Sequence, residues 1–258
     1  FAVQAGAVAT KSVKEASSEV DFVVTMVPVG SNVREIFLED GILAAAAPGT
    51  VMIDSSTIDV GSAQAVHEAA KSAGFNMIDA PVSGGVIGAD AGTLTFMCGG
   101  DKDSFEKAKP ILQGMGKNIV HCGSGGLGQA TKICNNMLAG INALAAAEAM
   151  TMGERLGVSP DILYEVISTS TGRSYIFETS NPMPDVCSTS PANNKFKPGF
   201  MAKLMLKDLR LSQAAAQDAK TSTPLGAAAT AAFQQLIDSG FGDLDTSSII
   251  KVIKPESK

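Results

Sequence analysis

Two residues one helical turn apart, Lys132 and Asn136, form the pair in this sequence that is best suited to proton transfer. Residues four apart share one face of a helix, and apolar Ile133 and Met137 lie beside them. Partial removal of water lowers the pKa of a lysine towards neutrality, so its amine can exchange a proton with a substrate oxygen. An amide one turn later can orient that substrate. In isolation, a solvated lysine beside a capping amide is the commoner reading of such a pair.

A second segment, DAPVSGG at residues 79–85, has the composition of an anion-binding turn. It follows a predicted strand, and α/β sheets bind ligands where their strands end. Gly84 and Gly85 let the backbone approach a ligand closely, while the Ser83 hydroxyl and successive backbone N–H groups can hold a carboxylate. An ordinary Gly-Gly turn explains the segment equally well.

A glycine-rich segment, GSGGLG at residues 123–128, matches the pattern G-x-G-x-x-G. A dinucleotide-binding fingerprint requires a return strand about 20 residues later that ends in an acidic residue. Here a helical pattern continues instead, and Glu148 lies inside it. We therefore interpret the segment as a hinge between domains and the start of a long helix.

The composition argues against several classes of protein. The net charge is −6 and no run of Lys and Arg is present, so nucleic-acid binding is not expected. The four cysteines form no C-x-x-C pair and the two histidines are far apart, so no zinc site is expected. Scattered cysteines fit a reducing compartment. No apolar run reaches the roughly 20 residues that cross a membrane.

The first half of the chain predicts a Rossmann-like, doubly wound parallel sheet, because short apolar strands alternate with helices. Strands are expected at residues 21–27, 50–56, 75–82, 93–98 and 118–122, and helices at residues 31–46, 61–73 and 101–115. The strand, glycine-rich turn and helix that open a Rossmann half are not present. The expectation is an N-terminally incomplete dinucleotide-binding domain that binds cofactor poorly as it stands and leaves a sheet edge unpaired.

The second half predicts an all-α domain built on one long interdomain helix at residues 126–157. A helix of about 30 residues is roughly 45 Å long, which is too long for a crossover in a small sheet. Further helices are expected at residues 160–169, 201–219, 225–239 and 246–253, with a proline-rich loop at residues 181–198. The predicted domains are residues 1–122 and residues 123–258.

Together these segments resemble the β-hydroxyacid dehydrogenase family across all 258 residues, and within it the 3-hydroxyisobutyrate dehydrogenase branch. The family's substrate and catalytic segments are similar to DAPVSGG at residues 79–85 and GQATKICNNML at residues 128–138. Its cofactor contacts resemble TMVP at residues 25–28 and DSSTID at residues 54–59. SPANN at residues 190–194, Gly199-Phe200 and LMLKDL at residues 204–209 resemble the hydroxyisobutyrate branch in particular.

The resemblance implies a role for each matching residue. Lys132 is the general acid/base, and Asn136 orients the substrate or the lysine. The substrate side consists of Ser83, Gly84, Gly85, Asn135, Phe200 and Asp208. The cofactor side consists of Val27, Pro28, Asn32, Thr57 and Lys207. In isolation, Lys207-Asp208 reads as solvated surface charge.

The implied reaction is the oxidation of 3-hydroxyisobutyrate to methylmalonate semialdehyde in valine catabolism. NAD is the expected cofactor, with NADP not excluded. A tartronate or succinate semialdehyde reductase and a truncated, non-catalytic remnant are the alternatives. The resemblance also implies a homodimer or homotetramer assembled through the all-α domain. The expected compartment is the mitochondrial matrix for a eukaryotic source and the cytoplasm for a bacterial one.

Overall fold

The computed structural model describes residues 6–39 and 41–254, and the chain divides into two compact units. Unit 1 ends at Lys132 and unit 2 begins at Ile133, inside a long helix. The boundary predicted from the sequence lies earlier, between residues 122 and 123, where the composition changes. The difference has a physical reason: the first turn of the long helix is hydrogen-bonded to the sheet of unit 1 and belongs with it.

Unit 1 is built on a six-stranded sheet with the order β1-β2-β3-β5-β4, in which β6 pairs with β5. Its strands are β1 (Phe22–Thr25), β2 (Val51–Asp54), β3 (Asn76–Asp79), β4 (Val82–Ser83), β5 (Leu94–Gly99) and β6 (Gly116–Gly123). The Rossmann-like fold is confirmed, and β1, β2 and β3 are parallel as predicted. The sheet is nevertheless mixed, because β5 runs antiparallel to β3 and β4 while β6 is parallel to β5. The chain reverses after β4 without a long crossover.

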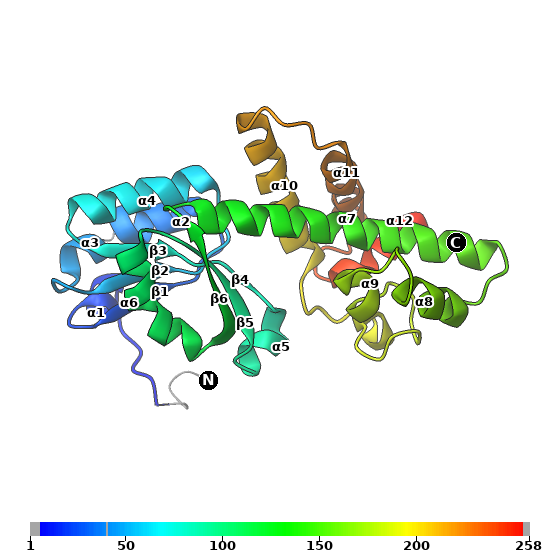
Figure 1. The fold of residues 1–258 in the computed structure, drawn as a ribbon, viewed down its shortest axis with the longest axis horizontal. Helices are drawn as coiled ribbons and strands as arrows, with labels where there is room; N and C mark the ends of the chain where they lie inside the picture. The colour runs from blue at the N-terminus through cyan, green and yellow to red at the C-terminus, as the bar shows by residue number, and fades with distance from the viewer. Residues whose placement is uncertain (1–5, 40, 255–258) are drawn as a thin grey trace. The chain divides into compact units, whose positions relative to one another are not determined.

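Helices cover both faces of this sheet (Figure 1). They are α1 (Val13–Ser17), α2 (Gly30–Arg34), the π-helix η1 (Glu35–Glu39), α3 (Ile42–Ala45), α4 (Val60–Ser72), α5 (Gly85–Asp90) and α6 (Lys102–Gln113). Met52 of β2 packs in the cluster that contains α2, η1, α3 and α4, whereas its neighbour Ile53 packs with α6. Successive residues of a strand point to opposite faces, so β2 is buried on both sides.

The helices of unit 1 differ from the prediction in two places. A single helix was expected at residues 31–46, but the structure has α2, η1 and α3, and Gly41 precedes α3 in a left-handed conformation. The short helix α5 was not predicted, because six residues that include two glycines carry no helical periodicity.

Unit 2 is all-α, as predicted. Its spine is α7 (Leu127–Arg155), which begins in unit 1 and is green in Figure 1. The other elements are α8 (Pro160–Ser168), α9 (Tyr175–Thr179), η2 (Pro191–Asn194), α10 (Ala202–Asp218), α11 (Pro224–Asp238), η3 (Thr246–Ile249) and α12 (Ile250–Ile253). Small residues of α7, including Ala143 and Ala147, face Leu209 of α10 and Phe233 of α11 in one buried cluster. This packing holds the C-terminal part of α7 in unit 2.

Candidate active site

The carboxyl ends of β1 and β2 are joined by a buried hydrogen-bond network. The Ser56 hydroxyl donates to Asp54 Oδ1 at 2.6 Å and accepts from the backbone N–H of Val27 at 2.9 Å. Thr25 Oγ1 also donates to Asp54 Oδ1, at 2.8 Å. Val27 and Pro28 were predicted to face the cofactor, and this network fixes the backbone at Val27. Parallel strands bind ligands at this end.

Asp54 is almost completely buried, and its Oδ2 has no hydrogen-bond partner among the described residues. Burial raises the pKa of this carboxyl above its ordinary value of 3.8, and the negative charge of Asp79 raises it further. The hydrogen bonds from Ser56 and Thr25 oppose both effects because they stabilise the charged form. These hydrogen bonds therefore offset only part of the increase, and the pKa of the carboxyl stays above its ordinary value.

Asp79, at the end of β3, anchors the start of α7. Its Oδ1 accepts hydrogen bonds from His67 Nε2 at 2.8 Å and from the N–H of Gly126 at 2.7 Å. Its Oδ2 accepts from the N–H of Gln129 at 2.8 Å. The first N–H groups of a helix have no intrahelical partner and carry partial positive charge, so a carboxylate there satisfies both needs.

Gln129 makes a second connection between α7 and the sheet. Its side chain is fully buried, with Nε2 donating to the carbonyl of Ser56 at 2.7 Å and Oε1 accepting from the N–H of Ile58 at 3.0 Å. These two bonds lie on either side of Thr57, which was predicted to contact the cofactor.

The glycine-rich segment at residues 123–128 allows the start of α7 to approach the sheet closely. A Cβ on Gly128 would lie 2.3 Å from the carbonyl oxygen of Met97 and 2.7 Å from that of Asp79. Both are backbone atoms that cannot move aside, so only glycine lets α7 approach the sheet this closely. The predicted start of the long helix at this segment is confirmed.

The proposed carboxylate turn lies on the surface of unit 1. Ser83 ends β4, and Gly84 and Gly85 follow with φ angles of +135° and +61°. Both glycines are exposed. The left-handed backbone that this turn requires is one that side chains other than glycine rarely adopt, and it leaves the backbone open to solvent.

The predicted catalytic pair occupies consecutive turns of α7. Lys132 is 7% exposed and Asn136 is 4% exposed, so both are buried. In unit 2, Asn136 Nδ2 donates to Asp208 Oδ2 at 2.5 Å, and Asn136 Oδ1 accepts from Asn135 Nδ2 at 2.9 Å. Because a carboxylate only accepts hydrogen bonds, Asp208 fixes the amide of Asn136 in one orientation. Lys207 Nζ lies 3.2 Å from Asp208 Oδ1.

Phe200 is held by a different carboxylate. Asp245 is buried, and its Oδ2 accepts from the N–H groups of Gly199 and Phe200, each at 3.0 Å. The aromatic ring packs against the core of unit 2.

The predicted site residues divide between the two units. Unit 1 contains Val27, Pro28, Asn32, Thr57, Ser83, Gly84, Gly85 and Lys132, and unit 2 contains Asn135, Asn136, Phe200, Lys207 and Asp208. Asn32 lies on α2, where its Nδ2 donates to Glu35 at 3.5 Å. Sequence reasoning assigned no individual role to Asp54, Ser56, His67 or Gln129, although three of them lie inside the motifs at residues 54–59 and 128–138. For Asp54 and Ser56 the available signal was the position of polar residues at the end of a buried strand, whereas no local pattern indicates the contacts of His67 and Gln129.

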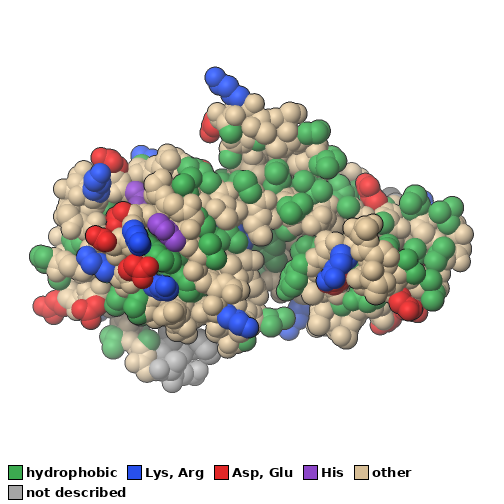
Figure 2. Space-filling view, viewed as in Figure 1, with side chains coloured by type: hydrophobic (Ala, Val, Ile, Leu, Met, Phe, Trp, Pro, Cys, Tyr) green, Lys and Arg blue, Asp and Glu red, His purple; other side chains and the backbone are tan. Residues whose placement is uncertain are grey.

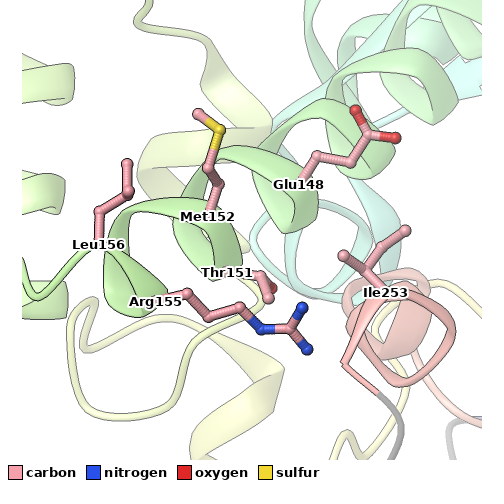
Figure 3. Close-up of a pocket in the computed structure, with 6 residues that line it drawn as sticks. All are labelled: Glu148, Thr151, Met152, Arg155, Leu156 and Ile253. Carbon is pink, nitrogen blue, oxygen red and sulfur yellow. The ribbon is translucent and has the colours of Figure 1, made fainter.

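A surface hollow on unit 2 contains none of these residues. It has a volume of about 350 Å³ and is lined by Glu148, Thr151, Met152, Arg155, Leu156 and Ile253. The Arg155 guanidinium extends towards Ile253 across it (Figure 3). The hollow is distinct from the candidate active site.

The described residues form neither a metal-binding cluster nor a membrane-spanning helix. In residues 6–39 and 41–254, no three His, Cys, Asp or Glu side chains are grouped so that they could hold a metal ion. Within the same ranges, no helix has the length and apolar character that a membrane span requires.

Comparison with known proteins places this geometry among nicotinamide-dependent enzymes. Residues 1–123 match the model of the NAD-binding domain of 6-phosphogluconate dehydrogenase. Residues 126–253 match the model described as the NAD-binding domain of NADP-dependent 3-hydroxyisobutyrate dehydrogenase.

Individual relatives cover most of the chain. The NAD-dependent L-serine dehydrogenase of Pseudomonas aeruginosa is 43% identical over 98% of this chain and 85% of its own length. The mitochondrial 3-hydroxyisobutyrate dehydrogenase of Mus musculus is 39% identical over 98% of this chain and 76% of its own. A structure of Mycobacterium tuberculosis 3-hydroxyisobutyrate dehydrogenase with L-serine is 44% identical, covers 97% of this chain and 86% of its own, and has a TM-score of 0.92.

The raised pKa of Asp54 predicts a pH-dependent effect of Asp54→Asn on stability. A carboxyl whose pKa is raised on folding contributes stability that is present below its unfolded pKa and lost as pH rises through its folded pKa. The neutral amide does not titrate, so the free energy of unfolding of the variant, taken relative to that of the wild type, should increase as the pH rises above 3.8, the ordinary pKa of the carboxyl. Urea unfolding of both proteins at a series of pH values measures this difference. A difference that stays constant with pH would contradict the raised pKa.

Proposed function

Since the chain belongs to the 3-hydroxyisobutyrate dehydrogenase family, whose domains bind NAD(P), we propose that it oxidises 3-hydroxyisobutyrate to methylmalonate semialdehyde. The proposal includes NAD as the cofactor and valine catabolism as the setting. The observation that carries it is the buried Lys132, which lies less than one turn after the point where Asp79 and Gln129 anchor α7. That point is the carboxyl end of the parallel strands, where α/β sheets bind nucleotides.

The residues at these strand ends fit a nicotinamide cofactor. Asp54 Oδ2 is a buried polar atom without a described partner, and the Val27–Pro28 backbone beside it is fixed by Ser56. We assign Val27, Pro28, Asn32, Thr57 and Lys207 to the cofactor. The nicotinamide supplies the hydride acceptor when it is bound.

The protein's own steps are binding, orientation and proton transfer. The exposed turn formed by Ser83, Gly84 and Gly85 holds the substrate carboxylate through its backbone N–H groups and the hydroxyl. Lys132 takes the proton of the β-hydroxyl group as hydride leaves the same carbon. Asn136 orients the reacting hydroxyl, and its amide keeps one orientation because Asp208 accepts from Nδ2.

L-serine is the second candidate substrate, because one relative is named as an NAD-dependent L-serine dehydrogenase. L-serine has the same carboxylate and β-hydroxyl groups, but an ammonium group replaces the methyl of 3-hydroxyisobutyrate. An ammonium needs an anionic or carbonyl partner when it is desolvated. Asp208 is the acidic residue among the predicted site residues, and it is already engaged by Asn136 and Lys207. This favours the methyl-bearing substrate.

A substrate panel tests the proposal. The purified protein is assayed with 3-hydroxyisobutyrate, L-serine, tartronate semialdehyde and succinate semialdehyde, with NAD(H) and NADP(H) in parallel. We expect the highest kcat/KM for 3-hydroxyisobutyrate with NAD, and a roughly 100-fold or greater loss of kcat in Lys132→Ala, the usual size of acid/base catalysis. Thr131→Ala, at an exposed position of the same helix, is the matched control. A higher kcat/KM for another substrate would reject the substrate assignment. Near wild-type turnover in Lys132→Ala would show that the lysine is not the acid/base. A complete lack of turnover in the wild-type protein would favour the non-catalytic remnant.

We further infer a homodimer or homotetramer assembled through unit 2. Met152 of α7 and Leu156, the residue directly after the end of α7, are 62% and 76% exposed, and Ile162 and Val166 of α8 are also exposed. Hydrophobic side chains gather over the end of unit 2 that contains α8 (Figure 2). Burying such a surface stabilises an interface.

Light scattering after size exclusion should therefore give at least twice the chain mass. Leu156→Glu should shift the protein towards monomer, because the charge cannot be buried cheaply. A monomeric wild type would contradict this assembly.

A further inference from the structure

The fully buried side chain of Gln129 connects the helix that carries Lys132 to the loop after β2. The Nε2 group donates to Ser56 O at 2.7 Å, and Oε1 accepts from Ile58 N at 3.0 Å. The two bonded peptide groups flank Thr57, so they fix the backbone on both sides of that residue.

The same loop is bound on its other side. The Ser56 hydroxyl accepts from Val27 N and donates to Asp54. Gln129, Ser56 and Val27 thus form one chain of hydrogen bonds that runs from α7 through the end of β2 to the end of β1. Lys132 follows Gln129 by less than one turn of the same helix.

Core filling alone does not explain an amide at this position. A buried amide loses its bonds to water, and an apolar residue of similar length would fill the space without that cost. The amide is suited to the site because it can donate at one end and accept at the other, which matches the carbonyl of Ser56 and the N–H of Ile58.

We propose that Gln129 is a positioning residue. It fixes the position of the Ser56–Ile58 loop, and thereby of the cofactor side of the site, relative to Lys132. The inference rests on the proposed function for the roles of Thr57 and Lys132. Gln129 itself contacts backbone groups and is not a catalytic residue. Its loss should weaken cofactor binding more than hydroxy-acid binding, because none of its hydrogen bonds reaches the Ser83–Gly85 turn.

The test is Gln129→Met, which keeps the length of the side chain and removes both hydrogen bonds. Ser56 O and Ile58 N are then left without these partners. We expect the amide of Ile58 to exchange with solvent deuterium at least about 10-fold faster, and the dissociation constant for NADH to rise about 10-fold, as the loss of about one hydrogen bond implies. The KM for the hydroxy acid should change less than about threefold. Thr131→Ala, which removes an exposed hydroxyl from the same helix, should alter none of these.

A conservative variant, Gln129→Glu, separates positioning from a general structural role. When protonated, the introduced carboxyl can donate to Ser56 O and accept from Ile58 N, but its ionised form cannot donate. The NADH affinity of this variant, taken relative to wild type at each pH, should therefore recover as pH falls from about 8.5 to 5.5. Asp54, Asp79 and His67 lie around this network, so Gln129→Met, whose side chain carries no charge at any pH, is measured over the same pH range as the control.

The outcomes are distinguishable. If wild type binds no NADH and oxidises no hydroxy acid, the proposed function fails, while the exchange rate of Ile58 still tests whether Gln129 holds the loop. Unchanged Ile58 exchange and unchanged NADH affinity in Gln129→Met overturn the inference. If that variant does not fold, a pH-independent affinity ratio for Gln129→Glu overturns it instead.

Discussion

The arrangement of the candidate site depends on one buried carboxylate, Asp79, which binds the N-terminus of α7 to the end of β3. Its oxygens accept hydrogen bonds from two backbone N–H groups of the α7 start and from His67. Helix N-termini stabilise negative charge, so the start of α7 offsets part of the desolvation cost of burying this carboxylate. The glycine at position 128 follows from the same contact, because a side chain there would collide with the backbone of the sheet.

The helix that Asp79 anchors carries the proposed catalytic residues. Lys132 is the last residue of unit 1, and Asn136 lies one turn later in unit 2, where Asp208 holds its amide. Gln129 ties the same helix to the loop that contains Thr57. Each unit therefore has a buried acid that binds residues at the start or in the middle of α7, Asp79 in unit 1 and Asp208 in unit 2. A glycine-rich segment that imitates a nucleotide-binding loop is used here for helix packing.

Much of this could be predicted from the sequence, because its signals are local. The apolar strands and the uninterrupted helical pattern after residue 126 identified the two kinds of domain, and α8, α10 and α11 lie where their periodicity placed them, whereas α9 and η2 were not predicted. The direction of β5 was not predictable in this way, since strand direction depends on a reversal at β4 that leaves no periodic signal. Asp79 was noticed as part of a motif, but its role as a helix cap depends on contacts with residues 126 and 129 that no local pattern reveals. Gln129 was missed for the same reason.

Substitution of Asp79 by Asn tests the anchoring of α7 most directly. Asp and Asn cap helices equally well when one oxygen is used, but at Asp79 both oxygens accept from backbone N–H groups, so an amide must turn its NH₂ towards a donor. Asp101, which caps α6 through the N–H of Ser104, is the matched control, because the Ser104 hydroxyl can accept from an amide. Urea unfolding should show a loss of about 2–4 kcal/mol for Asp79→Asn and about 1 kcal/mol or less for Asp101→Asn. Equal losses in the two variants would contradict the account.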